Sequence, residues 1–385
     1  MKISIDSRTI KKGEYFVPFK GEKFDGHDFI KQALENGARG VIEEDDLYEL
    51  VRKKLDKHKP KIIGVAGSIG KTTFRSYLYS ILKSKYKVFE SDLNTKIGFC
   101  LRIFNEYKHQ PIIVAEIGID RIGEMKSTSS FIRPSISVIT KLGKEHIESL
   151  KSLKNVVREE FEIFSYTKSK VKYVNSKDFR YYKKYTKVDK NYIFFDKVRI
   201  NNNVLVNIKK LQVPNHEIDY LRGVCYLVKK HFRFTDADFC NAILQLKKPK
   251  GRTNIFNGKN GSLIVDDTYN AVCDQTIIEG IKFATKLSKA KKRKLTVVIS
   301  NMVENGTTTE SQHKKVAEFI NSSGLSLVYL VGSDIDYYKK YLKIDFKEYL
   351  TADKISINPS QNDLIYIKAT RRYRGPELVG KIKNL

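Results

Sequence analysis

The run from Gly64 to Thr73, Gly-Val-Ala-Gly-Ser-Ile-Gly-Lys-Thr-Thr, follows the apolar pair Ile62-Ile63 and precedes a helical pattern at 77–82. Glycines let backbone N–H groups approach a phosphate chain, a lysine adds positive charge, and a threonine hydroxyl can hold Mg²⁺. The strict P-loop spacing requires glycine where Val65 stands, so the match is the shorter form at 67–72, which arises more often by chance. Because a strand precedes it and a helix follows it, the segment predicts a nucleotide phosphate-binding loop rather than a structural glycine turn. The predicted contacts are Gly67, Ser68, Gly70, Lys71, Thr72 and Thr73.

Two further polar residues follow apolar runs that are typical of buried strands. Glu116 comes directly after Ile113-Val-Ala115, and His146 comes shortly after Ile139-Thr140. Ligands collect at the carboxyl ends of parallel strands, and a phosphate-bound Mg²⁺ needs few protein oxygens, so one carboxylate there suffices. The alternatives are a solvated strand-end glutamate and a surface or core histidine.

The strands that must position these groups alternate with helices over most of the chain. Residues 1–60 mix short strands with one helical stretch, and end in a polar segment that predicts a domain junction. Residues 61–249 predict a mostly parallel sheet covered by helices, and residues 250–385 repeat this α/β pattern after a hinge at 249–252. The buried strands are predicted at 62–63, 112–115, 136–139, 172–174, 263–265, 295–299, 327–331 and 364–367.

The composition is that of a globular protein, with 385 residues and 41% hydrophobic content, enough for two or three domains. Lysine and arginine exceed aspartate and glutamate by 72 − 44 = 28, which favours anionic partners without choosing among RNA, lipid and phosphorylated substrates. The densest basic run, 289–294, is interpreted as a solvated loop rather than a nucleic-acid patch. The four cysteines show no CxxC spacing, and we find neither a signal-peptide pattern nor an apolar run long enough to span a membrane, so a cytoplasmic protein is expected.

The ordered set of motifs resembles the Mur ligase family of ATP-dependent amide-bond formers, over nearly the whole chain. The first-domain motifs are Asp6-Ser7-Arg8 and Asp25-Gly26-His27. The central motifs are the phosphate loop, Asn94, Glu116-Ile-Gly118 and His146. The last third contributes Gly251-Arg252, Asp266-Asp-Thr-Tyr-Asn-Ala271, Met302 with Glu304, and Lys368-Ala-Thr-Arg371.

The resemblance implies a three-domain fold with a central P-loop sheet and a Rossmann-like third domain. It also implies that a substrate carboxylate attacks the γ-phosphate of ATP and that an amine captures the acyl phosphate, with Mg²⁺ as cofactor. By this resemblance, Lys71, His146 and Arg252 are catalytic, and Thr72, Glu116, His146 and Glu160 bind metal. Asn94, Arg252 and Asp267 contact the nucleotide, while Ser7, Arg8, Asn270 and Arg371 bind the other substrates.

Several positions depart from the family pattern. Glu160 stands where members usually carry a lysine that CO₂ converts to a carbamate, and Glu159 or Glu162 is the counterpart if the register slips. Glu217 follows His216 where the family has asparagine beside adenine, and Val272-Cys273 replaces Asn-Pro near the amine site. The first domain is also short. We therefore expect a divergent ligase that joins an amino acid or a dipeptide such as D-alanyl-D-alanine to a UDP-muramoyl-peptide-like carboxylate.

Two alternatives stay open. One is a Mur-like ligase of a specialised peptide or polymer outside peptidoglycan, favoured by Val272-Cys273 and the short first domain. The other is a nucleotide-dependent nucleic-acid-binding protein, which the net charge of +28 allows but no RNA-binding motif supports. A monomer acting on small molecules is expected.

Overall fold

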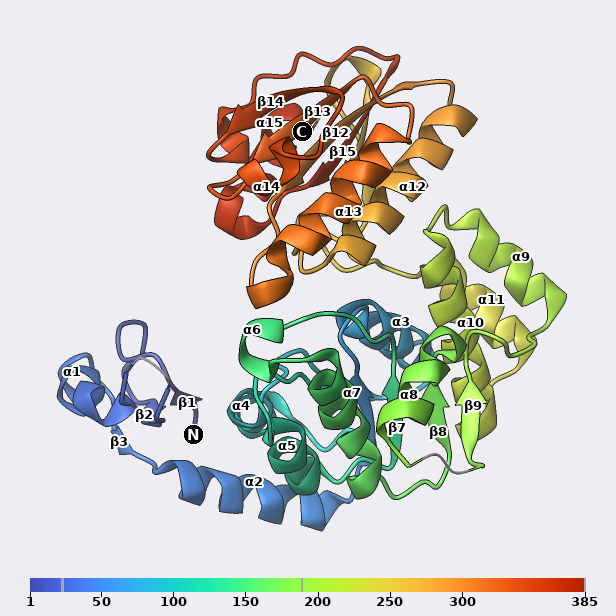
Figure 1. Cartoon of the computed structure of the whole chain (residues 1–385). Coiled ribbons are helices and arrows are strands. Elements are labelled where there is room, and N and C mark those ends of the chain that lie inside the picture. The colour runs from blue at the N-terminus through green and yellow to red at the C-terminus, as the bar shows by residue number, and fades with distance from the viewer. Residues whose placement is uncertain (22–23, 188–189, 384–385) are drawn as a thin grey trace.

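The computed structural model describes residues 1–21, 24–187 and 190–383, which form a small first domain, a central domain and a third domain (Figure 1). The first domain holds a three-stranded parallel sheet in the order β1-β2-β3, and each strand is two residues long. Its elements are β1 (Ile3–Ser4), β2 (Tyr15–Phe16), η1 (Gly26–Phe29), α1 (Ile30–Glu35) and β3 (Gly40–Val41).

Helix α2 (Glu44–His58) follows the first sheet but packs against the central domain. Its apolar positions Leu47, Val51 and Leu55 recur at helical spacing, and all three side chains are buried in the same core as residues of α4 (Lys96–Glu106). The structure thus extends the central core into residues that the sequence assigned to the first domain. The boundaries 1–60, 61–249 and 250–385 stay a prediction.

The central domain contains a six-stranded sheet in the order β5-β6-β4-β7-β8-β9, and every pair in it is parallel. Successive residues of a strand face opposite sides, so Ile63 and Val65 of β4 enter one core while Ile62 and Ala66 enter the other. The strands are β4 (Lys61–Ala66), β5 (Val88–Ser91), β6 (Ile112–Glu116), β7 (Ile136–Ile139), β8 (Lys172–Val174) and β9 (Tyr192–Phe194).

Helices cover both faces of this sheet. Side chains of α3, α9, α10 and α11 fill one core, and those of α2, α4, α5 and α7 fill the other. The bounds are α3 (Lys71–Lys83), α5 (Glu124–Ile132), α6 (Ile147–Leu150), α7 (Leu153–Phe161), η2 (Glu162–Tyr166), η3 (Ser176–Asp178), α8 (Phe179–Tyr185), α9 (Asn202–Lys210), α10 (Asn215–His231) and α11 (Asp236–Leu244).

The third domain has its own six-stranded sheet in the order β10-β11-β15-β12-β13-β14, parallel except for the edge strand β10. Helices α12 and α13 cover one face and α15 covers the other. The elements are β10 (Asn254–Asn257), η4 (Lys259–Gly261), β11 (Leu263–Asp266), α12 (Asp274–Ala290), β12 (Lys294–Ser300), η5 (Gly306–Thr308), α13 (Thr309–Asn321), β13 (Leu327–Val331), α14 (Asp336–Lys339), β14 (Asp345–Tyr349), η6 (Ala352–Lys354), β15 (Asp363–Lys368), η7 (Arg371–Tyr373) and α15 (Gly375–Ile382).

The α/β fold class predicted from the sequence is confirmed, and all eight predicted buried strands are present. The phosphate loop follows β4, Glu116 ends β6 and His146 follows β7, so all three lie at one edge of the central sheet. That edge faces the third domain. Within the described ranges, we find no helix with both the length and the apolar character that crossing a membrane requires.

Candidate active site

A cavity of about 360 Å³ lies between the central and third domains, and we call it the larger cavity. It brings the phosphate loop together with residues that follow β6, β7, β11, β12 and β15, which are far apart in the sequence. The lining residues are Ser68, Ile69, Gly70, Lys71, Thr72, Asn94, Glu116, Ile119, Asp120, Glu145, His146, Arg252, Tyr269, Asn270, Ala271, Val272, Thr276, Val303, Glu304, Thr370, Arg371 and Arg372.

The phosphate loop requires glycine at two positions. Gly67 and Gly70 have φ angles of +115° and +90°, and a Cβ atom on either would collide with Thr140 or Tyr220. The Thr140 hydroxyl also donates to the carbonyl of Ile69 at 2.8 Å, and Gly70 caps α3 immediately before Lys71. Backbone N–H groups at the start of α3 therefore face the larger cavity, as an anion-binding loop requires.

Lys71 is the cation at this helix start, and its side chain is 11% exposed. Its Nζ lies 3.5 Å from Oε2 of Glu145 and donates to the carbonyl of Ser68. Burial alone would lower the pKa of Lys71, but the carboxylates of Glu145, Glu160 and Glu116 raise it above its ordinary value. The lysine is therefore charged and can bind a phosphate.

Thr72 and Glu116 form the next contact of the cavity wall. The Thr72 hydroxyl donates to Oε1 of Glu116 at 3.2 Å, and Nε of Arg75 donates to the other carboxylate oxygen at 3.0 Å. Glu116 is only 6% exposed, which excludes the solvated strand-end alternative. The arrangement directs one hydroxyl and one carboxylate oxygen to a common point beside the phosphate loop.

His146 lies at the border of the two domains. Its Nε2 is 3.3 Å from Asp120 and 3.6 Å from Glu145, and its Nδ1 is 2.8 Å from Oε2 of Glu304 in the third domain. Burial opposes protonation, yet these carboxylates raise the pKa of His146 above its ordinary value. The ring is thus an ionic link between the domains.

Glu160 takes a different position from the one that a metal ligand in the larger cavity would need. Its side chain is 1% exposed, does not line that cavity, and accepts the backbone N–H of Gly67 at 2.7 Å. Burial raises the pKa of Glu160 to about 7, although Lys71 and the Gly67 N–H oppose the rise. In this arrangement Glu160 holds the backbone of the phosphate loop from a position outside the larger cavity.

The third domain contributes cations and one aromatic ring to the larger cavity. The Arg252 guanidinium lies 4.1 Å from the centroid of the Tyr269 ring, and its Nη1 donates to Asn270 at 3.1 Å. Arg371 lies 5.6 Å from the same ring. Such stacking holds both guanidinium groups at the cavity wall, opposite the phosphate loop.

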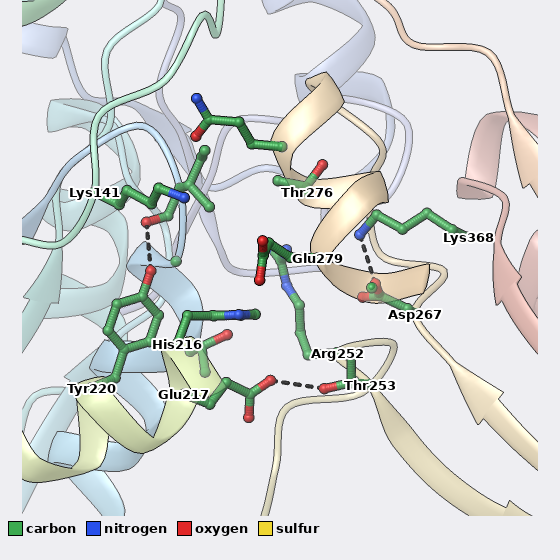
Figure 2. A pocket seen from close by; sticks show the side chains of 15 residues that line it. Lys141, His216, Glu217, Tyr220, Arg252, Thr253, Asp267, Thr276, Glu279 and Lys368 are labelled. Atoms are coloured by element: carbon green, nitrogen blue, oxygen red, sulfur yellow. Dashed lines mark hydrogen bonds and ion pairs between the residues drawn. The ribbon is translucent and has the colours of Figure 1, made fainter. Parts of the chain in front are cut away.

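A smaller cavity of about 50 Å³ adjoins the hinge and opens beside α12 (Figure 2). Within it, Oδ2 of Asp267 accepts from Lys368 at 2.8 Å and from Tyr366 at 2.9 Å, and Asp267 and Lys368 are almost fully buried. His216 and Lys141 line the opposite wall. The cavity is well below the roughly 300 Å³ of a typical ligand pocket.

The structure thus brings most of the predicted residues to the two cavities. Ser68, Gly70, Lys71, Thr72, Asn94, Glu116, His146, Arg252, Asn270 and Arg371 line the larger one, and Thr73 and Asp267 line the smaller. Ser7 and Arg8 lie in the first domain, away from both cavities, where they bond to Gln32 and Asp6. The roles of all these residues stay predictions.

Sequence reasoning missed Asp120 and Glu145 of this site, which lie in loops after β6 and β7. Tyr269, after β11, was part of the family pattern but was given no role. Their position after predicted strands was the available signal, since loops at one sheet edge converge there. Glu304 entered the family pattern, but its contact with His146 depends on how two domains meet.

A phosphate loop that faces a second α/β domain across a polar cavity defines a nucleotide-using enzyme whose site lies between two domains. A family model described as "Mur ligase family, catalytic domain" matches residues 2–67, and one described as "Mur ligase middle domain" matches residues 65–220. The chain belongs to the Mur ligase family. The resemblance predicted from the sequence is confirmed, as is the enzyme class, an ATP-dependent carboxylate–amine ligase.

Individual relatives agree with this assignment over almost the whole chain. The UDP-N-acetylmuramoyl-tripeptide–D-alanyl-D-alanine ligase of Rickettsia prowazekii is 24% identical over 98% of this chain and 94% of the relative. The enzyme of the same name from Bacillus subtilis is 25% identical over 98% and 92%. The MurF ligase structure from Thermotoga maritima in complex with ADP has a TM-score of 0.78 at 24% identity, covering 98% of this chain and 96% of that one.

Proposed function

We propose that this chain joins D-alanyl-D-alanine to the terminal carboxylate of a UDP-N-acetylmuramoyl-tripeptide and converts ATP to ADP and phosphate. The observation that carries the proposal is the larger cavity. There the phosphate loop and Glu116 of the central domain face Arg252 and Arg371 of the third domain. The names of the relatives supply the substrates.

In the first step a carboxylate oxygen of the tripeptide attacks the γ-phosphorus of ATP, and the bond from that phosphorus to the β–γ bridging oxygen breaks. Charge neutralisation and alignment dominate the catalysis of such transfers. Lys71 and the N–H groups of the loop hold the phosphates from one side, and Arg252 approaches from the other. ADP leaves, and the carboxylate has become an acyl phosphate.

The donor set beside the loop fits one Mg²⁺ ion. The oxygens of Thr72 and Glu116 lie 3.2 Å apart at the cavity wall, and hard oxygen donors suit this ion. When bound, Mg²⁺ would neutralise charge on the β- and γ-phosphates.

A second metal at His146 and Glu160 does not fit this arrangement. Both ring nitrogens of His146 contact carboxylates, and Glu160 bonds to the phosphate loop. Across the described part of the chain, no group of three or more His, Cys, Asp or Glu side chains is placed to hold a metal ion.

In the second step the amine nitrogen of the dipeptide attacks the acyl carbon, phosphate leaves and the nitrogen loses a proton. The dipeptide also carries a carboxylate, which needs a cationic partner. Arg371 lies on the third-domain wall with its guanidinium near Tyr269, and Asn270 adds an amide beside it. We assign these two residues to the incoming dipeptide.

The test is phosphate release from ATP by the purified full chain, with UDP-muramoyl-tripeptide and D-alanyl-D-alanine as substrates. Release that depends on both substrates, together with the pentapeptide product by mass spectrometry, would support the proposal. Phosphate release that requires neither this acceptor nor this amine would contradict the proposal.

A second candidate, ligation outside peptidoglycan, is favoured by one observation. Val272 lines the larger cavity beside Asn270 where the family has a polar Asn-Pro pair, so the wall that meets the amine is more apolar. Crossing other acceptor peptides with a panel of amino acids in the same assay separates the two functions.

A further inference from the structure

Glu217 occupies the position where the family resemblance predicts an asparagine beside adenine, but its carboxylate is engaged elsewhere. It lies in the first turn of α10, where the helix dipole favours a negative charge, and its side chain is 3% exposed. Figure 2 shows it among the side chains that line the smaller cavity, with its carboxylate turned to Thr253. The side chain at this position is therefore bonded to another residue of the chain, Thr253.

The partners of Glu217 come from three separate segments. The hydroxyl of Tyr77 on α3 donates to Oε2, and Oγ1 of Thr253 donates to Oε1 at 2.7 Å. Nζ of Lys248 lies 3.6 Å from Oε2. Both carboxylate oxygens are thus occupied, and the charge is paired, as a buried carboxylate requires.

The same contacts fix the hinge at 249–252 through the two residues that flank it, Lys248 and Thr253. Nζ of Lys248 donates to the carbonyl of Thr253 at 2.8 Å and to its hydroxyl at 2.9 Å. Gly251 and Thr253 have φ angles of +69° and +49°, so the hinge is tightly turned. Glu217 therefore holds both ends of a short loop that connects two domains.

Arg252 lies between those two ends. Its backbone N–H donates to Asn254, and its side chain extends from beside Thr253 into the middle of the smaller cavity (Figure 2). It lines both cavities and reaches Tyr269 and Asn270. Tyr77 lies on α3, the helix that follows the phosphate loop. The hydrogen bonds Tyr77–Glu217 and Glu217–Thr253 therefore connect α3 to the residue next to Arg252.

We propose that Glu217 is a positioning residue that sets the place of Arg252 relative to the phosphate loop. The inference rests on the proposed function, because it assigns Arg252 to the phosphates of ATP. Glu217 does not touch the reacting atoms; it acts through Thr253 and the hinge. A displacement of about 1 Å at a catalytic group can cost up to about 100-fold in rate. Losing a contact that holds Arg252 in place should therefore change the rate measurably.

The experiment compares Glu217→Gln, Thr253→Val and the double variant in the phosphate-release assay, with melting temperatures and ADP affinity measured on the same samples. Thr253→Val keeps the β-branched shape at a positive φ and removes the hydroxyl. The control is Asp196→Asn, a buried central-domain carboxylate bonded to Ser176 and absent from both cavity walls. Arg252→Ala and Arg252→Ala with Glu217→Gln complete the set.

We expect kcat to fall about 10-fold or more in Glu217→Gln and in Thr253→Val, with the double variant no worse than the stronger single one. In the Arg252→Ala background, Glu217→Gln should produce no further loss of kcat. Asp196→Asn should lower the melting temperature and leave kcat unchanged.

Normal kcat in Thr253→Val, or a further loss of kcat from Glu217→Gln when Arg252 is absent, would overturn the inference. Equal losses of kcat in Asp196→Asn and Glu217→Gln would also overturn it, since the effect would then be one of stability. Absence of ligation by the unmodified chain, with ADP binding intact, would instead contradict the proposed function.

Discussion

Nδ1 of His146 and Oε2 of Glu304 lie 2.8 Å apart, and this ion pair joins the central domain to the third domain across the larger cavity. The Glu304 side chain is 54% exposed, so the pair contributes only about 0.2–1 kcal/mol to the closed arrangement. A contact of that size can bias domain closure without locking it, which suits an enzyme that must admit and release nucleotides.

The first prediction concerns this pair. Glu304→Gln should lower kcat by up to about fivefold, because 1 kcal/mol is about the most that such a pair adds to closure. The melting temperature should hardly move. Steady-state kinetics and thermal unfolding check this, and Glu310→Gln, which removes a half-exposed third-domain carboxylate outside both cavities, is the control. A 100-fold loss would show that Glu304 takes part in chemistry.

Lys71→Ala should reduce ATP-dependent turnover by about 100- to 1000-fold, the range seen when one preorganised donor to a developing charge is removed. Some loss of stability should accompany it, since Glu145 and the buried Glu160 lose a cation. Lys83→Ala, at the far end of the same helix, is the matched control. Circular dichroism verifies the fold, and undiminished turnover in a folded Lys71→Ala protein would refute the phosphate-loop role.

Arg252 and Asp267 should behave differently from each other. Arg252→Ala should cost turnover with little change in melting temperature, because its guanidinium stacks on Tyr269 at a cavity wall. Asp267→Ala should also destabilise the third domain by about 3–5 kcal/mol, since it leaves Lys368 buried without its partner. Paired kinetic and unfolding measurements test the contrast. Equal unfolding curves for the two variants would contradict it.

Glu160→Gln should keep the shape of the phosphate loop, because an amide oxygen can still accept the Gly67 N–H. The loss of a carboxylate near Lys71 should lower kcat by about 10-fold. The activity of the unmodified chain should not change when bicarbonate is added. Glu160→Lys should lose activity without bicarbonate and regain it when bicarbonate is supplied, because the carbamate restores the negative charge. Bicarbonate activation of the unmodified chain would mean that a lysine elsewhere forms the carbamate.

Asp178 provides a prediction about pH. Burial raises the pKa of its carboxyl from 3.8 to about 6, although the Leu142 N–H donates to it at 2.8 Å. A folded pKa above the unfolded value means that ionisation destabilises the fold; the cost appears as pH rises from about 4 to 6 and is complete above it. Asp178→Asn should therefore increase the free energy of unfolding by about 1–3 kcal/mol at pH 8, and so raise the melting temperature there. At pH 4 it should do neither. A uniform shift at both pH values would contradict this.

The sequence predicted the interior of both large sheets and missed their edges. The four strands that were not predicted, β5, β9, β10 and β14, are the outermost strands of the two sheets. A central strand such as Leu364–Ile367 is buried on both faces and appears as a continuous apolar run, whereas β14 reads Asp-Phe-Lys-Glu-Tyr and is largely exposed. Every residue of β9, β10 and β14 is at least partly exposed, and β5 ends in Glu90-Ser91, so the edge strands lack a long apolar run.

The candidate site was predictable where a short motif carries its own geometry. The phosphate loop and strand-end Glu116 are of this kind, since glycine, lysine and threonine at fixed spacing need only one strand and one helix. The contacts of His146 with Glu304 and of Glu217 with Thr253 were not predictable. They depend on the approach of two domains, which no local pattern of residues encodes.

The packing of α2 has a practical consequence for dissecting the molecule. Leu47, Val51 and Leu55 each contribute about 1.5–3 kcal/mol of burial to the core that they share with α4. A fragment that starts at residue 60 would lose those side chains and expose apolar residues of α4, such as Phe99 and Ile103, to water. Such a fragment should aggregate, whereas one that starts before Glu44 keeps the helix and should remain dispersed in solution.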